Sequence, residues 1–206
     1  MTKVKLCGLK RLCDIEWANE VRPDFVGFVF AGKKRRVTDD VANDLRRHLD
    51  PSIPAVGVFV NEPQEHIVEL VQNGVIQVVQ LHGQEDNTYI DSLRQRIDVP
   101  ILKAFSVTGL ESLQDIKTSK ADYVLLDNGP GGTGEAFDWS YIQHRVTRPF
   151  FLAGGLTPEN VMQAMALKPY ALDVSSGIET DGVKDKEKII KFMAHVRHYV
   201  PQEGNE

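Results

Sequence analysis

The chain is poor in cysteine, in long apolar runs and in excess basic charge, and each deficit excludes a class of protein. Of 206 residues only Cys7 and Cys13 are cysteines; they are too far apart for a CxxC redox pair and lack the companions of a zinc site. No apolar run approaches the roughly 18 residues that a membrane span needs. The formal net charge of -5 and the dispersed Lys and Arg residues disfavour nucleic acid as a partner.

The amino-terminal residues also lack the features of a secretory signal. Met1 and Thr2 lead directly into the alternating run Lys3-Val4-Lys5-Leu6-Cys7, without a basic segment, an apolar stretch and a small-residue cleavage site. We therefore expect a cytoplasmic protein with free thiols, no metal ion, no membrane partner and no nucleic-acid partner.

Short β-rich runs alternate with amphipathic helical patterns along the whole chain. The expected strands cover residues 4–7, 25–30, 55–60, 76–81, 101–105, 123–127, 150–153 and 171–174. The expected helices cover residues 14–21, 39–49, 63–73, 87–97, 109–118, 139–145, 158–167 and 185–199. The equal spacing of about eight such units, without a long mid-chain crossover, favours an α/β fold of the (βα)8 TIM barrel type over an open doubly wound sheet.

A single domain accounts for this regular pattern. The length lies within the range of single α/β barrels, and no linker or low-complexity stretch interrupts the repeat of strands and helices. We expect one barrel catalytic domain over residues 1–200 and a flexible tail over residues 201–206.

Two of the expected strands end in a reactive side chain, Cys7 before Gly8 and Asp127 before a glycine-rich segment. In a parallel barrel, side chains at the carboxyl ends of strands point into the mouth where ligands bind. A lone Cys in an apolar strand is more often a small buried hydrophobe, and the alternative for Asp127 is a helix or turn cap. Taken together, a thiol base facing a carboxylic acid suggests proton transfer.

The last two expected strands are followed by glycine and hydroxyl residues. Residues 152–156 read LAGGL and precede a helix expected to begin at Pro158 with Thr157 as N-cap, and strand 171–174 continues into SSG. Paired glycines allow a ligand close to the backbone, and barrels commonly bind phosphate in the loops after their last two strands. A plain glycine turn is the alternative at each loop. The pair predicts a phosphorylated small molecule as substrate, bound by Gly154, Gly155, Ser176 and Gly177.

Ordered segments across nearly the whole chain resemble the phosphoribosylanthranilate isomerases. They read KVKLCGL, DFVGFVF, GVFVN, VVQLHGQ, LLDNGPGGTGEAFDW, LAGGLTPENV and DVSSGIE. The resemblance implies an aldose-ketose isomerase of tryptophan biosynthesis. Its reaction is the Amadori rearrangement of N-(5-phosphoribosyl)anthranilate to 1-(2-carboxyphenylamino)-1-deoxyribulose 5-phosphate. The resemblance implies no metal or organic cofactor, and it allows a monomer or a homodimer.

The resemblance also implies catalytic roles for the two strand-end residues. The general base of the family matches Cys7 and the general acid matches Asp127. The reaction needs a thiolate and a protonated carboxyl group. The apolar residues before Asp127 disfavour its anion, and Lys5, on the same strand face as Cys7, would favour a thiolate.

Three further residues are matched as substrate-binding candidates. The arginine that binds the anthranilate carboxylate matches Arg36, although Arg35 is an alternative because Lys34 stands where the family commonly has Ser. In the QLHG segment, Gln80 and His82 are two residues apart on one strand, so both side chains are expected to point into the mouth. There His82 either contacts substrate or is satisfied by backbone groups. Asp173 is expected either to orient a substrate hydroxyl or to pair with an inward Lys.

Two other functions are compatible with parts of this pattern. The histidine-pathway aminoaldose isomerase performs an Amadori rearrangement on a related barrel, but it uses Asp at both catalytic positions and is built from two similar halves. This chain has Cys7 and no evident half repeat. A noncatalytic barrel that binds a phosphorylated ligand would keep the glycine turns but would need neither Cys7 nor Asp127.

Overall fold

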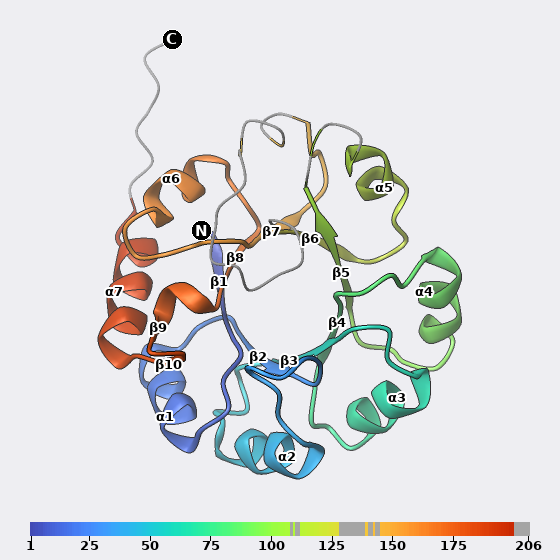
Figure 1. Ribbon diagram of the computed structural model, residues 1–206, viewed down its shortest axis with the longest axis horizontal. Coiled ribbons are helices and arrows are strands. Elements are labelled where there is room, and N and C mark those ends of the chain that lie inside the picture. Colours follow the sequence, from blue (N-terminus) through green and yellow to red (C-terminus); the bar gives the residue numbers. More distant parts are fainter. Residues whose placement is uncertain (108, 110–111, 128–138, 140–141, 143–144, 200–206) are drawn as a thin grey trace.

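In the computed structural model, residues 1–107, 109, 112–127, 139, 142 and 145–199 are described. The barrel strands are β1 (Lys3–Cys7), β2 (Phe25–Val29), β3 (Ala55–Phe59), β4 (Val78–Leu81), β5 (Ile101–Ser106), β6 (Tyr123–Asp127), β7 (Phe150–Leu152) and β8 (Ala171–Val174). Each strand pairs with the next in parallel, and β8 pairs with β1, so the sheet closes. The expected TIM barrel is confirmed (Figure 1).

Helices surround the barrel strands on the outside (Figure 1). They are α1 (Leu12–Val21), α2 (Asp39–His48), α3 (Gln64–Gln72), α4 (Asn87–Arg94), α5 (Ser112–Thr118), α6 (Val161–Ala166) and α7 (Lys186–Arg197). Helix α2 has the sequence features that stabilise helix ends. The Thr38 hydroxyl accepts the Val41 N–H as an N-cap, and acidic residues in the first turn and basic residues in the last turn complement the helix dipole. In the described part of the chain no helix is long and apolar enough to cross a membrane.

Apolar residues on the strands pack on both faces of the sheet. On β6, Leu125 faces the barrel interior, whereas Val124 and Leu126 pack in the larger cluster between the sheet and the helices. Burial of both faces explains why the strand sequences are nearly all apolar. The interior core lies below the carboxyl ends of the strands, where buried polar residues replace it.

Several elements differ from the sequence-based expectation. Helix α6 begins at Val161, three residues after the expected start, because residues 158–160 form a turn in which the Asn160 and Val161 N–H groups both donate to the Thr157 carbonyl. A hairpin, β9 (Glu179–Thr180) and β10 (Val183–Lys184), was not expected. Most of the expected helix 139–145, and the tail 201–206, lie outside the described residues.

Phe151 packs at the centre of an aromatic cluster in the barrel interior. Its substitution therefore tests how much this core contributes to stability. It is 2% exposed, and its ring lies 5.6 Å from Phe25, 5.7 Å from Tyr123 and 5.6 Å from Tyr170. Phe151→Ala is expected to lower the free energy of unfolding in urea by about 3–5 kcal/mol, through lost burial and a residual cavity. Met162→Ala, at an exposed helix position, is the control; equal effects of the two substitutions would contradict this account of the core.

Candidate active site

A cavity of about 290 Å³ opens at the carboxyl ends of the barrel strands. Polar side chains from separate strands line it, and the glycine turn after β7 and the serines after β8 complete its wall. The strand-derived polar residues are Cys7, Gln80, His82, Asp127 and Asp173. The residues predicted from strand ends and from strand parity therefore lie in one cavity.

The Cys7 thiol sits at the end of β1 beside a buried ammonium group. The Lys5 Nζ lies 3.2 Å from the Cys7 Sγ. Burial raises the pKa of the Cys7 thiol, while the Lys5 charge opposes that rise. Gly27 on the neighbouring strand makes room for the sulfur, since a Cβ atom there would lie 2.8 Å from it. Gly27 was not predicted from sequence as part of the site.

Lys5 has no solvent exposure and is held by two further partners. Its Nζ donates to the Gln80 Oε1 at 2.7 Å and to the Asp173 Oδ2 at 2.9 Å. Burial alone would lower the pKa of Lys5, but the charges of Asp173 and Cys7 outweigh it and raise that pKa, so the side chain is an ammonium ion. The other Asp173 oxygen, Oδ1, is buried and has no hydrogen-bond partner among the described residues.

Asp127 and His82 occupy the side of the mouth formed by β6 and β4. Asp127 is 7% exposed, and its Oδ2 lies 3.5 Å from the His82 Nε2. The other ring nitrogen of His82, Nδ1, lies 3.0 Å from the Gln80 Nε2. Gln80 thus joins the Lys5 cluster to the imidazole that faces Asp127. The glycine-rich segment that follows Asp127, residues 128–134, lies outside the described residues.

The conformation of the turn after β7 depends on two glycines with positive φ angles and on the side chain of an asparagine. Gly154 and Gly155 have φ angles of 83° and 63°, a region that other residues rarely adopt. The Asn160 side chain donates to the Gly155 carbonyl at 2.8 Å and accepts the Thr157 N–H at 2.9 Å. Asn160 therefore fixes the turn, a role that the sequence did not reveal.

The turn after β8 packs directly on the turn after β7. A Cβ atom on Gly177 would lie 1.8 Å from the Leu156 carbonyl oxygen, so only glycine allows this approach. Ser176 lines the cavity together with Gly154 and Gly155, whereas Gly177 lies behind it, against the neighbouring turn.

The two arginines after β2 occupy different environments. Arg35 lines the mouth, and its guanidinium donates to both carboxylate oxygens of Glu179, at 2.7 and 2.9 Å. Arg36 is exposed and lines a separate depression that also contains Phe30 and His66. Among the described residues, the Arg36 side chain has no hydrogen bond or ion pair that would have to break before it bound a ligand.

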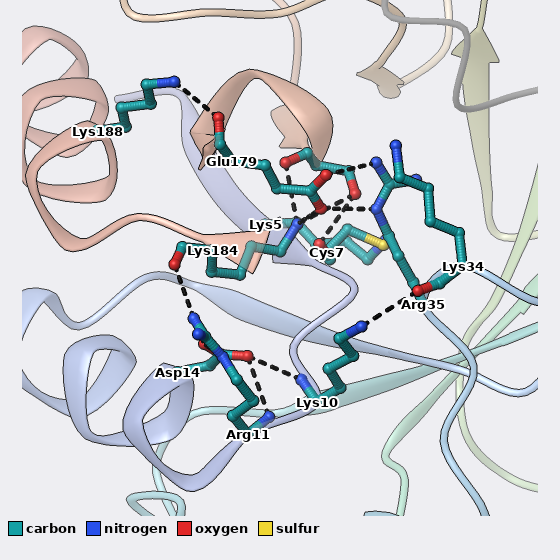
Figure 2. Close-up of polar contacts among 11 residues, drawn as sticks. Lys5, Cys7, Lys10, Arg11, Asp14, Lys34, Arg35, Glu179, Lys184 and Lys188 are labelled. Atoms are coloured by element: carbon teal, nitrogen blue, oxygen red, sulfur yellow. Dashed lines mark hydrogen bonds and ion pairs between the residues drawn. The ribbon is translucent and has the colours of Figure 1, made fainter. Parts of the chain in front are cut away.

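The β9–β10 hairpin contributes two charged residues that sequence reasoning missed (Figure 2). Glu179 accepts from Arg35 and also from the Lys184 Nζ at 2.7 Å. Lys184 donates to the Ser175 carbonyl at 2.9 Å, and the Ser175 hydroxyl donates to the Cys7 carbonyl at 3.1 Å. The Asp-Gly pair at 181–182, with positive φ at both residues, was the one sequence signal for this hairpin.

Taken together, these features define a class of protein. A closed parallel barrel with a thiol and a carboxyl group in one mouth, next to two small-residue turns suited to an anion, is typical of a barrel enzyme that moves protons on a phosphorylated substrate. In the described part of the chain no group of three or more His, Cys, Asp or Glu side chains is arranged to hold a metal ion.

Comparisons with known proteins identify the family. A family model described as N-(5'phosphoribosyl)anthranilate (PRA) isomerase matches residues 4–195. An N-(5'-phosphoribosyl)anthranilate isomerase from Endomicrobium trichonymphae is 45% identical over 202 residues, which cover 96% of this chain and 99% of the relative. The solved enzyme from Thermus thermophilus is 34% identical, with a TM-score of 0.85 and coverage of 95% of this chain and 98% of that one.

A second solved relative is a PRA isomerase crystallised with reduced 1-(o-carboxyphenylamino)-1-deoxyribulose 5-phosphate; it is 34% identical, with a TM-score of 0.83 and coverage of 97% of this chain and 100% of that one. The chain belongs to the N-(5'-phosphoribosyl)anthranilate isomerase family. It is accordingly an aldose-ketose isomerase of tryptophan biosynthesis, as the resemblance in the sequence implied.

The Glu179 ion pairs give the site a testable pH dependence. Burial would raise the pKa of Glu179, but the hydrogen bonds from Arg35 and Lys184 outweigh it and lower that pKa from 4.5 to about 2. Because the folded-state pKa lies below the unfolded one, this carboxylate stabilises the fold fully above pH 4.5, and the contribution is lost as the pH falls to about 2. Glu179→Gln is therefore expected to be less stable than the parent at neutral pH, with a difference that shrinks between these two values.

The measurement is urea unfolding at a series of pH values. Glu159→Gln is the matched control, because Glu159 pairs with Lys191 on an exposed surface and should have little effect at any pH. A stability difference for Glu179→Gln that stays constant down to the lowest pH would contradict the assigned role of this carboxylate.

Proposed function

We propose that Cys7 is the general base and Asp127 the general acid of the rearrangement. Asp127 protonates the furanose ring oxygen, so that the ring C–O bond breaks and an iminium ion forms at C1. Cys7 then removes the C2 proton, and the electron pair left on C2 gives the enamine, which tautomerises to the ketose. The observation that carries the proposal is the presence of this thiol and this carboxyl group in one small cavity.

The environment of Cys7 supports its role as a base, because the neighbouring charge of Lys5 favours formation of the thiolate. Burial raises the pKa of the thiol, which leaves less thiolate at neutral pH, and Lys5 at 3.2 Å counteracts this effect. A thiolate at a buried position beside an ammonium is a base that bulk water solvates little.

The two small-residue turns are proposed to bind the substrate phosphate. Gly154, Gly155 and Ser176 face the cavity, where backbone N–H groups and a hydroxyl are suited to phosphate oxygens. Gly177 contributes by allowing the second turn to pack on the first. The phosphorylated ligand in the solved relative is consistent with a phosphate site in the same fold.

The remaining substrate contacts are proposed for Arg36, His82 and Asp173. The exposed guanidinium of Arg36 is free to take up a planar carboxylate such as that of anthranilate, whereas Arg35 would first have to release Glu179. The Asp173 Oδ1, which has no hydrogen-bond partner in the described part of the chain, is suited to accept a hydrogen bond from a substrate hydroxyl. His82 lines the cavity next to Asp127.

All of these proposed residues come from one chain, so the site is compatible with a monomer and with a homodimer. A Thermotoga maritima relative has been solved as monomers of a dimeric enzyme. We expect a site of this kind to act in either assembly, and we propose that the protein is cytoplasmic.

The assignment of the base is tested by Cys7→Ala. We expect turnover to fall by at least about 100-fold, the usual contribution of general base catalysis, while the reduced product analogue still binds. The assay is the loss of fluorescence of enzymatically generated phosphoribosylanthranilate. Cys13→Ala, which removes the other, partly exposed thiol, is the control and should keep full activity. Near-full turnover by Cys7→Ala would show that another group is the base, and would leave a noncatalytic role open for the thiol.

The choice between the two arginines is tested by Arg36→Met and Arg35→Met. Arg36→Met is expected to raise KM by about tenfold or more, because one charged hydrogen-bonding group is lost from substrate binding, with little change in unfolding free energy. Arg35→Met is expected to lower the unfolding free energy, because it leaves Glu179 short of a partner. If only Arg35→Met raises KM, the carboxylate ligand is one residue earlier in the chain.

A further inference from the structure

We propose that Gln80 is a positioning residue that holds His82 as its neutral, Nε2-protonated tautomer facing Asp127. The proposal follows from a chain of contacts that runs from Lys5 through Gln80 and His82 to Asp127. Its effect on catalysis rests on the proposed role of Asp127, whereas the tautomer of His82 does not depend on that role.

The first step is the orientation of the Gln80 amide. An ammonium group is a donor only, so the Gln80 atom 2.7 Å from the Lys5 Nζ must be the carbonyl oxygen. Lys5 is fully buried and its pKa is raised by Asp173 and Cys7 against the effect of burial, so it is charged. The amide is therefore fixed, with its NH2 group turned toward His82.

The second step is the protonation of the imidazole. The Gln80 NH2 group is a donor only, and it lies 3.0 Å from the His82 Nδ1, so this nitrogen must be the acceptor. An imidazolium ion, or the tautomer protonated on Nδ1, would place two N–H groups against each other. His82 is therefore neutral, and its proton is on Nε2.

The third step is the effect on Asp127, whose Oδ2 lies 3.5 Å from that Nε2. An imidazolium at this place would hold Asp127 as a carboxylate and deprive the reaction of its acid. A neutral N–H does not bring a charge. When the Asp127 O–H bond breaks and the proton forms an O–H bond with the ring oxygen, the electron pair stays on the carboxylate, which the Nε2–H group then stabilises.

Other charged groups near His82 do not supply a competing partner for Nδ1. Glu85, which lines a neighbouring cavity together with His82, is paired with Lys103 at 3.0 Å and accepts N–H groups from Asn61 and Gly83. The remaining charged groups that line the cavities around His82 are Lys33, Lys34, Arg35, Asp86, Asp115 and Asp173. Among the described residues, the contacts of the His82 ring nitrogens are those with Gln80 and Asp127.

The tautomer can be read directly from the unmodified enzyme labelled with 15N-histidine. Long-range proton-nitrogen spectra distinguish the two neutral tautomers from the imidazolium, and the signals of His82 are identified as those that vanish in His82→Asn. The expected result at neutral pH is a His82 ring protonated on Nε2 alone. A ring protonated on Nδ1, or on both nitrogens, would overturn the proposal whatever the activity of the enzyme.

The role of Gln80 is tested by Gln80→Glu, which keeps an oxygen for Lys5 but replaces the donor to Nδ1 by an acceptor. We expect a proton on Nδ1 and a higher pKa of His82 in an NMR titration. We also expect kcat to fall by about tenfold for each pKa unit by which the charged ring makes the proposed acid, Asp127, more acidic. The decrease should grow toward low pH, where more of the ring is charged. A purely structural role would lower stability without moving this titration.

The matched control is Gln77→Glu, the same change of side chain just before β4 at the opposite end of the barrel, where Gln77 bonds to backbone groups of Gly74 and Ala55. If Gln80→Glu does not fold, Gln80→Met removes the donor without adding charge, and the His82 titration is again expected to rise. Parent-like titration and kcat in the folded Gln80 variants would overturn the role of Gln80. An enzyme with the expected tautomer that does not need Asp127 for turnover would refute the proposed role of Asp127 and leave the tautomer assignment standing.

Discussion

The buried ammonium of Lys5 is the constraint on which the rest of the site depends. A charged group without solvent exposure costs several kcal/mol unless its donors are satisfied, and Lys5 meets this requirement with three partners from three strands. Asp173, Gln80 and Cys7 are therefore held in fixed positions relative to one another. Because these partners come from β8, β4 and β1, Lys5 holds side chains of three strands together at the mouth and places its positive charge beside the Cys7 thiol.

Close packing at the mouth of the barrel leaves no room for a side chain at Gly27 or at Gly177. Gly27 lies against the Cys7 sulfur, and Gly177 lies against the Leu156 carbonyl. Gly27 gives space to the Cys7 sulfur, and Gly177 allows the two turns proposed to bind phosphate to pack on each other. The absence of a side chain at these two glycines is therefore as necessary for the geometry of the mouth as the charged groups are.

The alternation of side chains along strands made much of this site predictable. Cys7 and Asp127 end their strands, and Gln80 and His82 share one parity, so their placement in the mouth followed from the barrel alone. Arg35 and Arg36 lie in a loop, where no such alternation decides which side chain turns inward. The same limit explains why Asn160, Glu179 and Lys184 were missed, since all three lie outside the eight barrel strands. Glu179 in addition meets Arg35 only after the barrel closes.

The charges around Cys7 explain why a site with a buried thiol suits an anionic substrate. In the described structure, the cations Lys5, Arg35 and Lys184 are balanced by only two carboxylates, Asp173 and Glu179. The cluster therefore carries one positive charge more than its carboxylates can neutralise while Cys7 remains a thiol. Such an excess attracts a negative charge in a site of low dielectric constant, either as a thiolate or as a phosphate at the neighbouring turns. A thiolate at Cys7 and a phosphate at those turns would be stabilised by the same positive charge, so the proposed arrangement would couple the ionisation of Cys7 to the occupancy of the mouth.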